Sequence, residues 1–172
     1  DVQRGAPGGL ARRRQGHRLA VRASGKRVEA LPDHQAVAHD HGAAAPHKLT
    51  LNQGQKWSTD EPLRAGMGRI RGLVEPQLGA AHAGKLTPVQ YRELATQVET
   101  AVGGIVANCK LEPKADAVLH LVIADIGAGT DAMAGKDAKL RPALGLVKVA
   151  QAVNQYGSHF DDPGFKPIRN VR

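Results

Sequence analysis

The sequence has a single cysteine, Cys109, so it cannot close a disulfide within itself. It has no C-x-x-C-H motif, which excludes covalently attached haem. No run of eighteen apolar residues exists, so no segment is expected to span a membrane. The lack of a Glu-x-x-His motif disfavours a di-iron carboxylate bundle, and the lack of a G-x-S-x-G motif excludes a nucleophile elbow.

Aromatic residues are also scarce, with one tryptophan, two tyrosines and two phenylalanines in the whole chain. None of them lies ahead of Trp57; the others are Tyr91, Tyr156, Phe160 and Phe165. Alanine, leucine and valine must therefore supply most of a hydrophobic core. Because small side chains shorten the distance between helix axes, this composition suits closely packed helices.

Positive charge is concentrated at the start of the chain. Residues 1–48 hold nine Lys or Arg against four acidic residues, a net +5 out of the total of +8. Gly, Arg, Ala and Pro dominate residues 1–35, where no helical or strand period is sustained. Such a segment cannot bury enough apolar surface to offset the entropy of ordering it. We therefore expect residues 1–47 to form a disordered basic leader.

Residues 36–38, Ala-Val-Ala, match the A-x-A pattern of a secretory cleavage site, which would make His39 the first residue of a periplasmic or secreted protein. The apolar segment of a signal peptide does not precede this site. Two interpretations stay open: the leader is an off-frame translation of DNA that once encoded a signal peptide, or it is a genuine solvated arm. The stretch ARRRQGHR allows salt-sensitive association with nucleic acid, but no specific nucleic-acid partner is expected.

The first of four predicted amphipathic helices covers residues 58–84. Ser58 and Glu61 have the spacing of a capping box, Pro76 is expected to kink or split the helix, and Gly84 is expected to end it. Its apolar positions recur at steps of three and four, and they are Leu63, Met67, Ile70, Val74, Leu78 and Ala81.

The second predicted helix covers residues 87–109. Thr87 is its expected N-cap, Pro88 stands at the first helical position, and Gln90 completes a capping box. Its apolar stripe consists of Tyr91, Leu94, Val98, Val102, Ile105 and Cys109.

The third and fourth predicted helices cover residues 113–135 and 142–160, and each begins at a proline. All the links between the predicted helices are short, which favours antiparallel neighbours. The fold class expected for residues 58–172 is therefore all-α, an up-down-up-down four-helix bundle with left-handed, coiled-coil-like packing. Residues 48–57 are expected to pack extended along it, with Trp57 closing one end. Phe165 and Ile168 are expected to fold back on the end of the bundle.

The helix number, helix lengths and short loops over residues 58–161 resemble the soluble periplasmic four-helix cytochromes, both the b-type bundle and cytochrome c prime. In the b-type bundle, a methionine early in the first helix and a histidine late in the last hold the haem iron. Met67 and His159 stand at the matching positions. The resemblance thus implies non-covalent haem with these two axial ligands. Neighbouring glycines are expected to leave space for the flat ring: Gly66, Gly68 and Gly157.

Histidines at the end of the leader suggest a different kind of site. After cleavage behind Ala38, the new amino group, two backbone amides and His41 would form the square-planar four-nitrogen site that Cu(II) and Ni(II) favour. His39 and His47 are candidate additional ligands. Two imidazoles and the Asp40 carboxylate also suit Zn(II).

Two functions from different classes follow from these patterns. One is a non-enzymatic periplasmic helical-bundle protein that binds a transition metal through His39, His41 and His47. The other is a b-type haem electron-transfer protein with Met67 and His159 as ligands. The glycine-rich stretch 127–136 lacks the G-x-x-x-x-G-K-[ST] spacing of a phosphate loop, and no enzymatic activity is expected.

Overall fold

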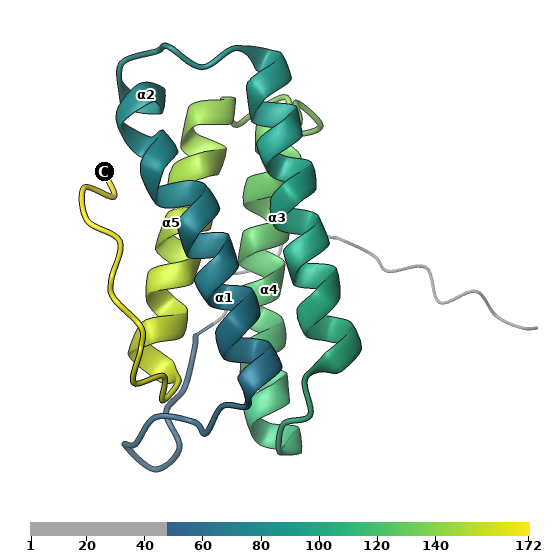
Figure 1. Cartoon of the computed structure of the whole chain (residues 1–172), viewed down its shortest axis with the longest axis vertical. Coiled ribbons are helices and arrows are strands. Elements are labelled where there is room, and N and C mark those ends of the chain that lie inside the picture. The colour runs from purple at the N-terminus through teal and green to yellow at the C-terminus, as the bar shows by residue number, and fades with distance from the viewer. Residues whose placement is uncertain (1–47) are drawn as a thin grey trace, which may run out of the picture. The chain divides into compact units, whose positions relative to one another are not determined.

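Figure 1 shows the computed structural model, which describes residues 48–172. The predicted leader, residues 1–47, lies outside the described residues. The described part of the chain is helical, apart from turns, irregular links and two isolated bridges. The all-α class predicted from the sequence is confirmed for this part. None of its helices combines the length and the apolar character needed to cross a membrane.

The first predicted helix is divided at Pro76. Helix α1 (Glu61–Val74) is followed by a 3-10 turn (Glu75–Gln77) and by the short helix α2 (Leu78–His82). Proline has no backbone N–H, and its ring disturbs the preceding turn, so regular α-helical hydrogen bonding changes there. The helix ends before Gly84, whose φ of +65° lies in the left-handed region that favours glycine. Both the split and the stop are as predicted.

The start of α1 differs from the prediction. Asp60 caps the helix, because its Oδ1 accepts a hydrogen bond from the backbone N–H of Leu63 at 3.0 Å. The predicted capping box of Ser58 with Glu61 is therefore wrong. Asp60 directly precedes the first helical residue, and a carboxylate in that position reaches the free N–H groups of the first turn.

The three long helices begin and end close to the predicted residues: α3 is Pro88–Asn108, α4 is Pro113–Met133 and α5 is Pro142–His159. Each has a proline in its first turn, where a missing N–H costs nothing. The capping box at the start of α3 is confirmed, since Thr87 and Gln90 each bind the other's backbone N–H through a side-chain oxygen.

The four longer helices enclose one aliphatic core. Helix α1 contacts α3 and α5, and α4 contacts the same two helices. Figure 1 shows successive long helices side by side, with the chain reversing direction at each link. As the scarcity of aromatics predicted, aliphatic side chains dominate the core. Its fully buried members include Leu63, Met67, Ile70, Val74, Val98, Val122, Ile126, Leu146, Val149 and Val153.

Trp57 closes the end of the helical unit where α1 begins and α5 ends, as predicted. It is only 5% exposed, and its backbone forms a parallel bridge with Phe160. Its indole Nε1 donates to the carbonyl of Thr50 at 2.7 Å. The residues just before it contain a tight turn, bridged between Asn52 and Gln55, that the expectation of an extended segment did not include.

The C-terminal segment returns along the helices (Figure 1). The Asn154 side chain holds it, since Nδ2 donates to the Ile168 carbonyl at 2.9 Å and Oδ1 accepts from the Ile168 N–H at 2.8 Å. Phe165 packs edge-on against Tyr156, with 5.6 Å between ring centroids. Gly157 makes this possible, because a Cβ at that position would overlap the Phe165 ring. The predicted return of Phe165 and Ile168 is confirmed.

Candidate functional site

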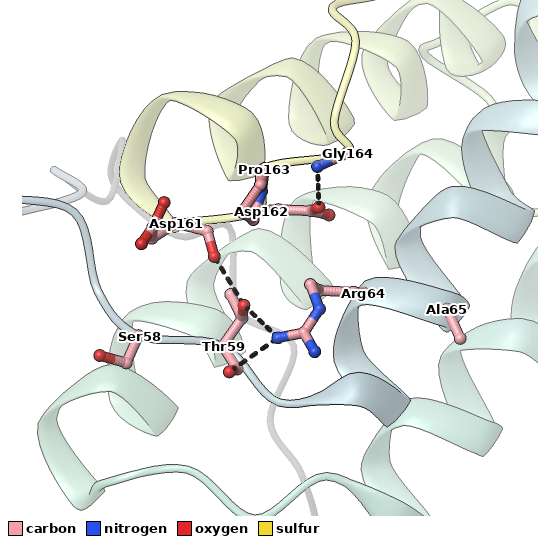
Figure 2. Close-up of a pocket in the computed structure, with 8 residues that line it drawn as sticks. All are labelled: Ser58, Thr59, Arg64, Ala65, Asp161, Asp162, Pro163 and Gly164. Atoms are coloured by element: carbon pink, nitrogen blue, oxygen red, sulfur yellow. Dashed lines mark hydrogen bonds between the residues drawn. The ribbon is translucent and has the colours of Figure 1, made fainter.

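A polar cleft opens where α1 begins and the C-terminal segment leaves α5 (Figure 2). Its volume is about 720 Å³. We take it as the candidate site because polar groups from two distant parts of the sequence meet there. The lining residues are Ser58, Thr59, Arg64, Ala65, Asp161, Asp162, Pro163 and Gly164.

Arg64 brings a positive charge into the polar cleft from the first turn of α1. Its Nη1 donates to both the backbone carbonyl and the Oγ1 of Thr59, each at 3.0 Å. The Thr59 hydroxyl in turn donates to the carbonyl of Asp161 at 2.6 Å. Figure 2 shows this chain of hydrogen bonds joining the segment before α1 to the segment after α5. The guanidinium is thereby fixed in one orientation.

Asp162 forms the opposite wall of the polar cleft. Its Oδ2 accepts a hydrogen bond from the Tyr156 hydroxyl at 3.0 Å, and its Oδ1 accepts from the N–H of Gly164 at 3.1 Å. Burial, together with the hydrogen bond to the charged Asp162, raises the pKa of the Tyr156 hydroxyl. The phenol therefore stays neutral at physiological pH and serves as a donor that orients the carboxylate.

Most polar groups of the cleft are hydrogen-bonded to neighbouring protein groups. Among the described residues that line it, only Ser58 has a hydroxyl without a hydrogen bond, and none is a histidine or a cysteine. Nucleophilic catalysis needs a nucleophile within hydrogen-bond reach of a base. Both oxygens of Asp162 already accept hydrogen bonds. The lining thus provides one oriented cation and two carboxylates, and the hydrogen bond from the Thr59 hydroxyl to the Asp161 carbonyl holds the two chain segments together.

The structure places the two haem ligands expected from the sequence in α1 and at the end of α5. Met67 is fully buried on the core side of α1. His159 is half-buried at the end of α5, with its Nδ1 2.8 Å from the carbonyl of Gln155. The N–H of Trp57 donates to the His159 carbonyl at 2.8 Å, so the segment leading into α1 adjoins the end of α5. Neither proposed ligand lines the polar cleft.

The space expected for a haem ring is filled at two of the three glycines. A Cβ at Gly66 would overlap Ile105 of α3, and a Cβ at Gly157 would overlap Phe165. Gly68 faces open space. The expectation of space beside Gly66 and Gly157 is therefore wrong, because side chains distant in the sequence occupy it.

The histidines of the predicted metal site, His39, His41 and His47, lie outside the described residues. Within residues 48–172, no three His, Cys, Asp or Glu side chains gather into a group that could hold a metal ion. Cys109 is half-buried at the end of α3. Burial, followed by the charges of Asp60 and Asp116, raises the pKa of its thiol, so it stays protonated.

Sequence reasoning missed the residues that build the polar cleft. Thr59 and Asp161 stand 102 positions apart, and no local pattern pairs residues at that distance. The stretch 161–164, Asp-Asp-Pro-Gly, is a recognisable turn signal, and the bond from the Gly164 N–H to an Asp162 oxygen is such a turn. That signal could have marked one wall, but nothing in the sequence singles out Arg64.

Comparison of the chain with protein-family models, with curated proteins and with solved structures returned no match. The resemblance to the four-helix cytochromes therefore stays a prediction.

Proposed function

We propose that this chain is a non-enzymatic, periplasmic or secreted protein that binds a transition metal next to a helical scaffold. The observation that carries the proposal is the clustering of His39, His41 and His47 directly ahead of the helical unit. Imidazole nitrogen is a preferred protein ligand of Cu(II), Ni(II) and Zn(II), and Asp40 adds a carboxylate.

The scaffold in this proposal is an up-down-up-down four-helix bundle with left-handed packing. The pairwise contacts of α1 with α3 and α5, and of α4 with the same helices, support it. So does the reversal of chain direction between neighbours in Figure 1. Within the described residues every buried polar side-chain atom has a hydrogen-bond partner, as expected of a rigid support.

Metal affinity in this proposal depends on where the mature chain begins. With His39 as the first residue, its amino group, two backbone amides and His41 supply four nitrogens in a plane, which suits Cu(II) and Ni(II). With the leader attached, that amino group is part of a peptide bond. The imidazoles and Asp40 then remain as ligands, and the affinity should be far lower.

Native mass spectrometry of the protein with Cu(II), Ni(II) or Zn(II) tests both parts, because one spectrum gives the first residue and the bound ions. We expect one bound metal ion, and its loss in the variant His39→Ala/His41→Ala/His47→Ala. The matched control is His120→Ala, which removes an exposed imidazole of α4. Equal metal uptake by the triple variant and this control would overturn the proposal.

A second candidate function is b-type haem binding by Met67 and His159. It is favoured by the contact of His159 Nδ1 with the Gln155 carbonyl, which leaves Nε2 free to bind an iron. His159 is half-buried, whereas the Met67 side chain is enclosed by the core. Haem would supply electron transfer once bound, and its entry requires Ile105 or Phe165 to move. A visible spectrum after adding haem decides, since a Soret band absent from His159→Ala supports this function and a spectrum of free haem excludes it.

A further inference from the structure

The segment that follows α5 returns along the helices without forming regular structure (Figure 1). We call residues 164–170, Gly-Phe-Lys-Pro-Ile-Arg-Asn, the strap. Within the described residues, its one hydrogen bond between backbone groups joins the Phe165 N–H to the Asp162 carbonyl, in the turn at its start. Side chains must therefore hold the strap in place.

Two helix side chains bind the strap through its backbone. Arg71 of α1 donates from Nε to the Lys166 carbonyl. Asn154 of α5 accepts from the Ile168 N–H at 2.8 Å and donates to the Ile168 carbonyl at 2.9 Å. These bonds use groups that every amino acid except proline carries. A different extended peptide could therefore form them equally well.

Two apolar side chains anchor the strap, three positions apart. The Phe165 ring packs against Tyr156 and occupies the space that a Cβ on Gly157 would fill. Ile168 is only 4% exposed, whereas the two residues between these anchors are exposed. Backbone hydrogen bonds combined with sites for spaced side chains are the usual means by which proteins bind extended peptides. The strap is thus held like a peptide ligand.

The end of the helical unit stays closed without the strap. The Trp57 N–H donates to the His159 carbonyl, and the Trp57 carbonyl accepts from the Asp161 N–H, each at 2.8 Å. These bonds precede the turn at residues 162–165, so rotation in that turn frees the strap and leaves them intact. Arg71 and Asn154 are half-buried, so water can replace their bonds to the strap.

We propose that the strap is releasable and that it blocks a surface which binds extended peptides. The surface consists of Arg71, Asn154 and the space beside Tyr156 and Gly157. Its occupant is a peptide segment of another protein molecule, with bulky apolar residues at its first and fourth positions. The closed strap lowers the apparent affinity by the fraction of time for which it occupies the surface. This surface shares no residue with the proposed metal site, so the failure of metal binding leaves it unaffected.

Fluorescence polarisation with a labelled peptide of residues 164–170 tests the surface in the full chain. The variant Phe165→Ala/Ile168→Ala removes both anchors of the strap and leaves the surface unchanged. We expect this double variant to bind the peptide at least tenfold more tightly than the wild type, in which the strap competes. Equal binding by the two chains, or no binding by the double variant, would overturn the proposal.

A third substitution in the double variant locates the peptide. Asn154→Ala removes two hydrogen bonds to the peptide backbone and should weaken binding roughly five- to fiftyfold. The matched control is Asn108→Ala in the same background, because the Asn108 side chain bonds to the Gly104 carbonyl within α3. This control should bind as the double variant does. An equal loss in both would place the peptide elsewhere and would refute the surface.

Gly157→Ala releases the strap without changing its sequence. The new methyl group takes the place of the Phe165 ring, while alanine suits the helix better than glycine. We expect hydrogen exchange of the Ile168 N–H to become at least tenfold faster and that of Val149, within α5, to stay the same. Gly68→Ala is the control, because nothing lies within 4 Å of its Cβ. An unchanged rate at Ile168, or equal acceleration at both amides, would show that the strap does not open separately from the helices.

Discussion

The contact between α4 and α5 and the contact between α1 and α3 both involve glycine, yet they are closed in different ways. A Cβ on Gly145 would lie 2.6 Å from the carbonyl oxygen of Gly129 and 2.9 Å from the backbone nitrogen of Met133. A Cβ on Gly66 would meet only the side chain of Ile105. A backbone cannot move aside unless the helices separate, whereas a side chain can change rotamer. Glycine therefore sets the distance between the backbones of α4 and α5. Between α1 and α3 it only accommodates a side chain that can move.

The α1–α3 contact is the more open of the two. A groove of about 530 Å³ remains between these helices, and its lining includes Ala65, Gly66 and Gly104. One carboxylate holds the pair at the end of the groove. Asp60 caps α1 through Oδ1, and its Oδ2 accepts a hydrogen bond at 2.6 Å from the N–H of Lys110, just beyond α3. The α4–α5 interface thus depends on close backbone packing. The α1–α3 interface depends more on the hydrogen bond between Asp60 and Lys110.

The largest effect is expected for Gly145→Ala. The added methyl group has no space between the two backbones, so the free energy of unfolding should fall by about 3 kcal/mol. Alanine is the better helix former by about 1 kcal/mol, so a net loss would show that the overlap dominates. Denaturant unfolding measures the change. Gly127→Ala in α4 is the control, because nothing lies within 4 Å of its Cβ. Wild-type stability of Gly145→Ala would mean that α4 and α5 do not approach this closely.

The next largest effect is expected for Asp60→Ala, which removes both the cap of α1 and the tie to Lys110. The expected loss of unfolding free energy is about 2 kcal/mol, since a cap alone is worth about 1 kcal/mol. Asp60→Asn is the informative partner, because its amide oxygen can still cap α1 while its NH₂ group cannot accept from Lys110. We expect Asn to lie between Asp and Ala in thermal or denaturant unfolding. Identical stability of Asn and Asp would show that the tie contributes nothing.

Helix positions were predictable because their signals are local. Pro88, Pro113 and Pro142 stand at the starts of three helices, and Gly84 and Pro76 mark a stop and a break, so a few neighbouring residues decide each boundary. The cap of α1 was misassigned because three adjacent candidate capping residues, Ser58 to Asp60, compete, and only the chain's entry angle selects among them.

The contacts between helices and the candidate site were not predictable in the same way. Gly129 lies in the glycine-rich stretch 127–136, which lacks the spacing of a phosphate loop, and it serves as a contact point for α5. Gly66 gave the expectation of an empty space, but Ile105 fills that space from another helix. The bonds that join Arg64, Thr59 and Asp161 depend on which helix ends meet. That arrangement depends on the packing of the whole core, so no residue spacing in the sequence indicates it.

A smaller effect is expected for Gly66→Ala, where the new methyl group meets Ile105. Isoleucine in a helix strongly prefers one χ1 rotamer, so the side chain yields only at a cost, and we expect a net loss of about 1 kcal/mol in unfolding free energy. A double-mutant cycle with Ile105→Ala tests the cause. If the overlap is responsible, the double variant loses less than the sum of the two single variants. Additive losses would place the origin of the effect elsewhere in α1.

The smallest effect, and the one of opposite sign, is expected for Gly104→Ala near the C-terminal end of α3. Nothing lies within 4 Å of its Cβ, and the new methyl group would enter the groove between α1 and α3. With no overlap, the higher helix propensity of alanine should raise the unfolding free energy by about 0.5–1 kcal/mol. Gly103→Ala is the matched control, because its Cβ is equally free but does not line the groove. Equal gains in denaturant unfolding would confirm that the groove has room for a methyl group. A gain at Gly103 with a loss at Gly104 would mean that α1 and α3 pack as tightly as α4 and α5, and the two interfaces would then be closed by the same means.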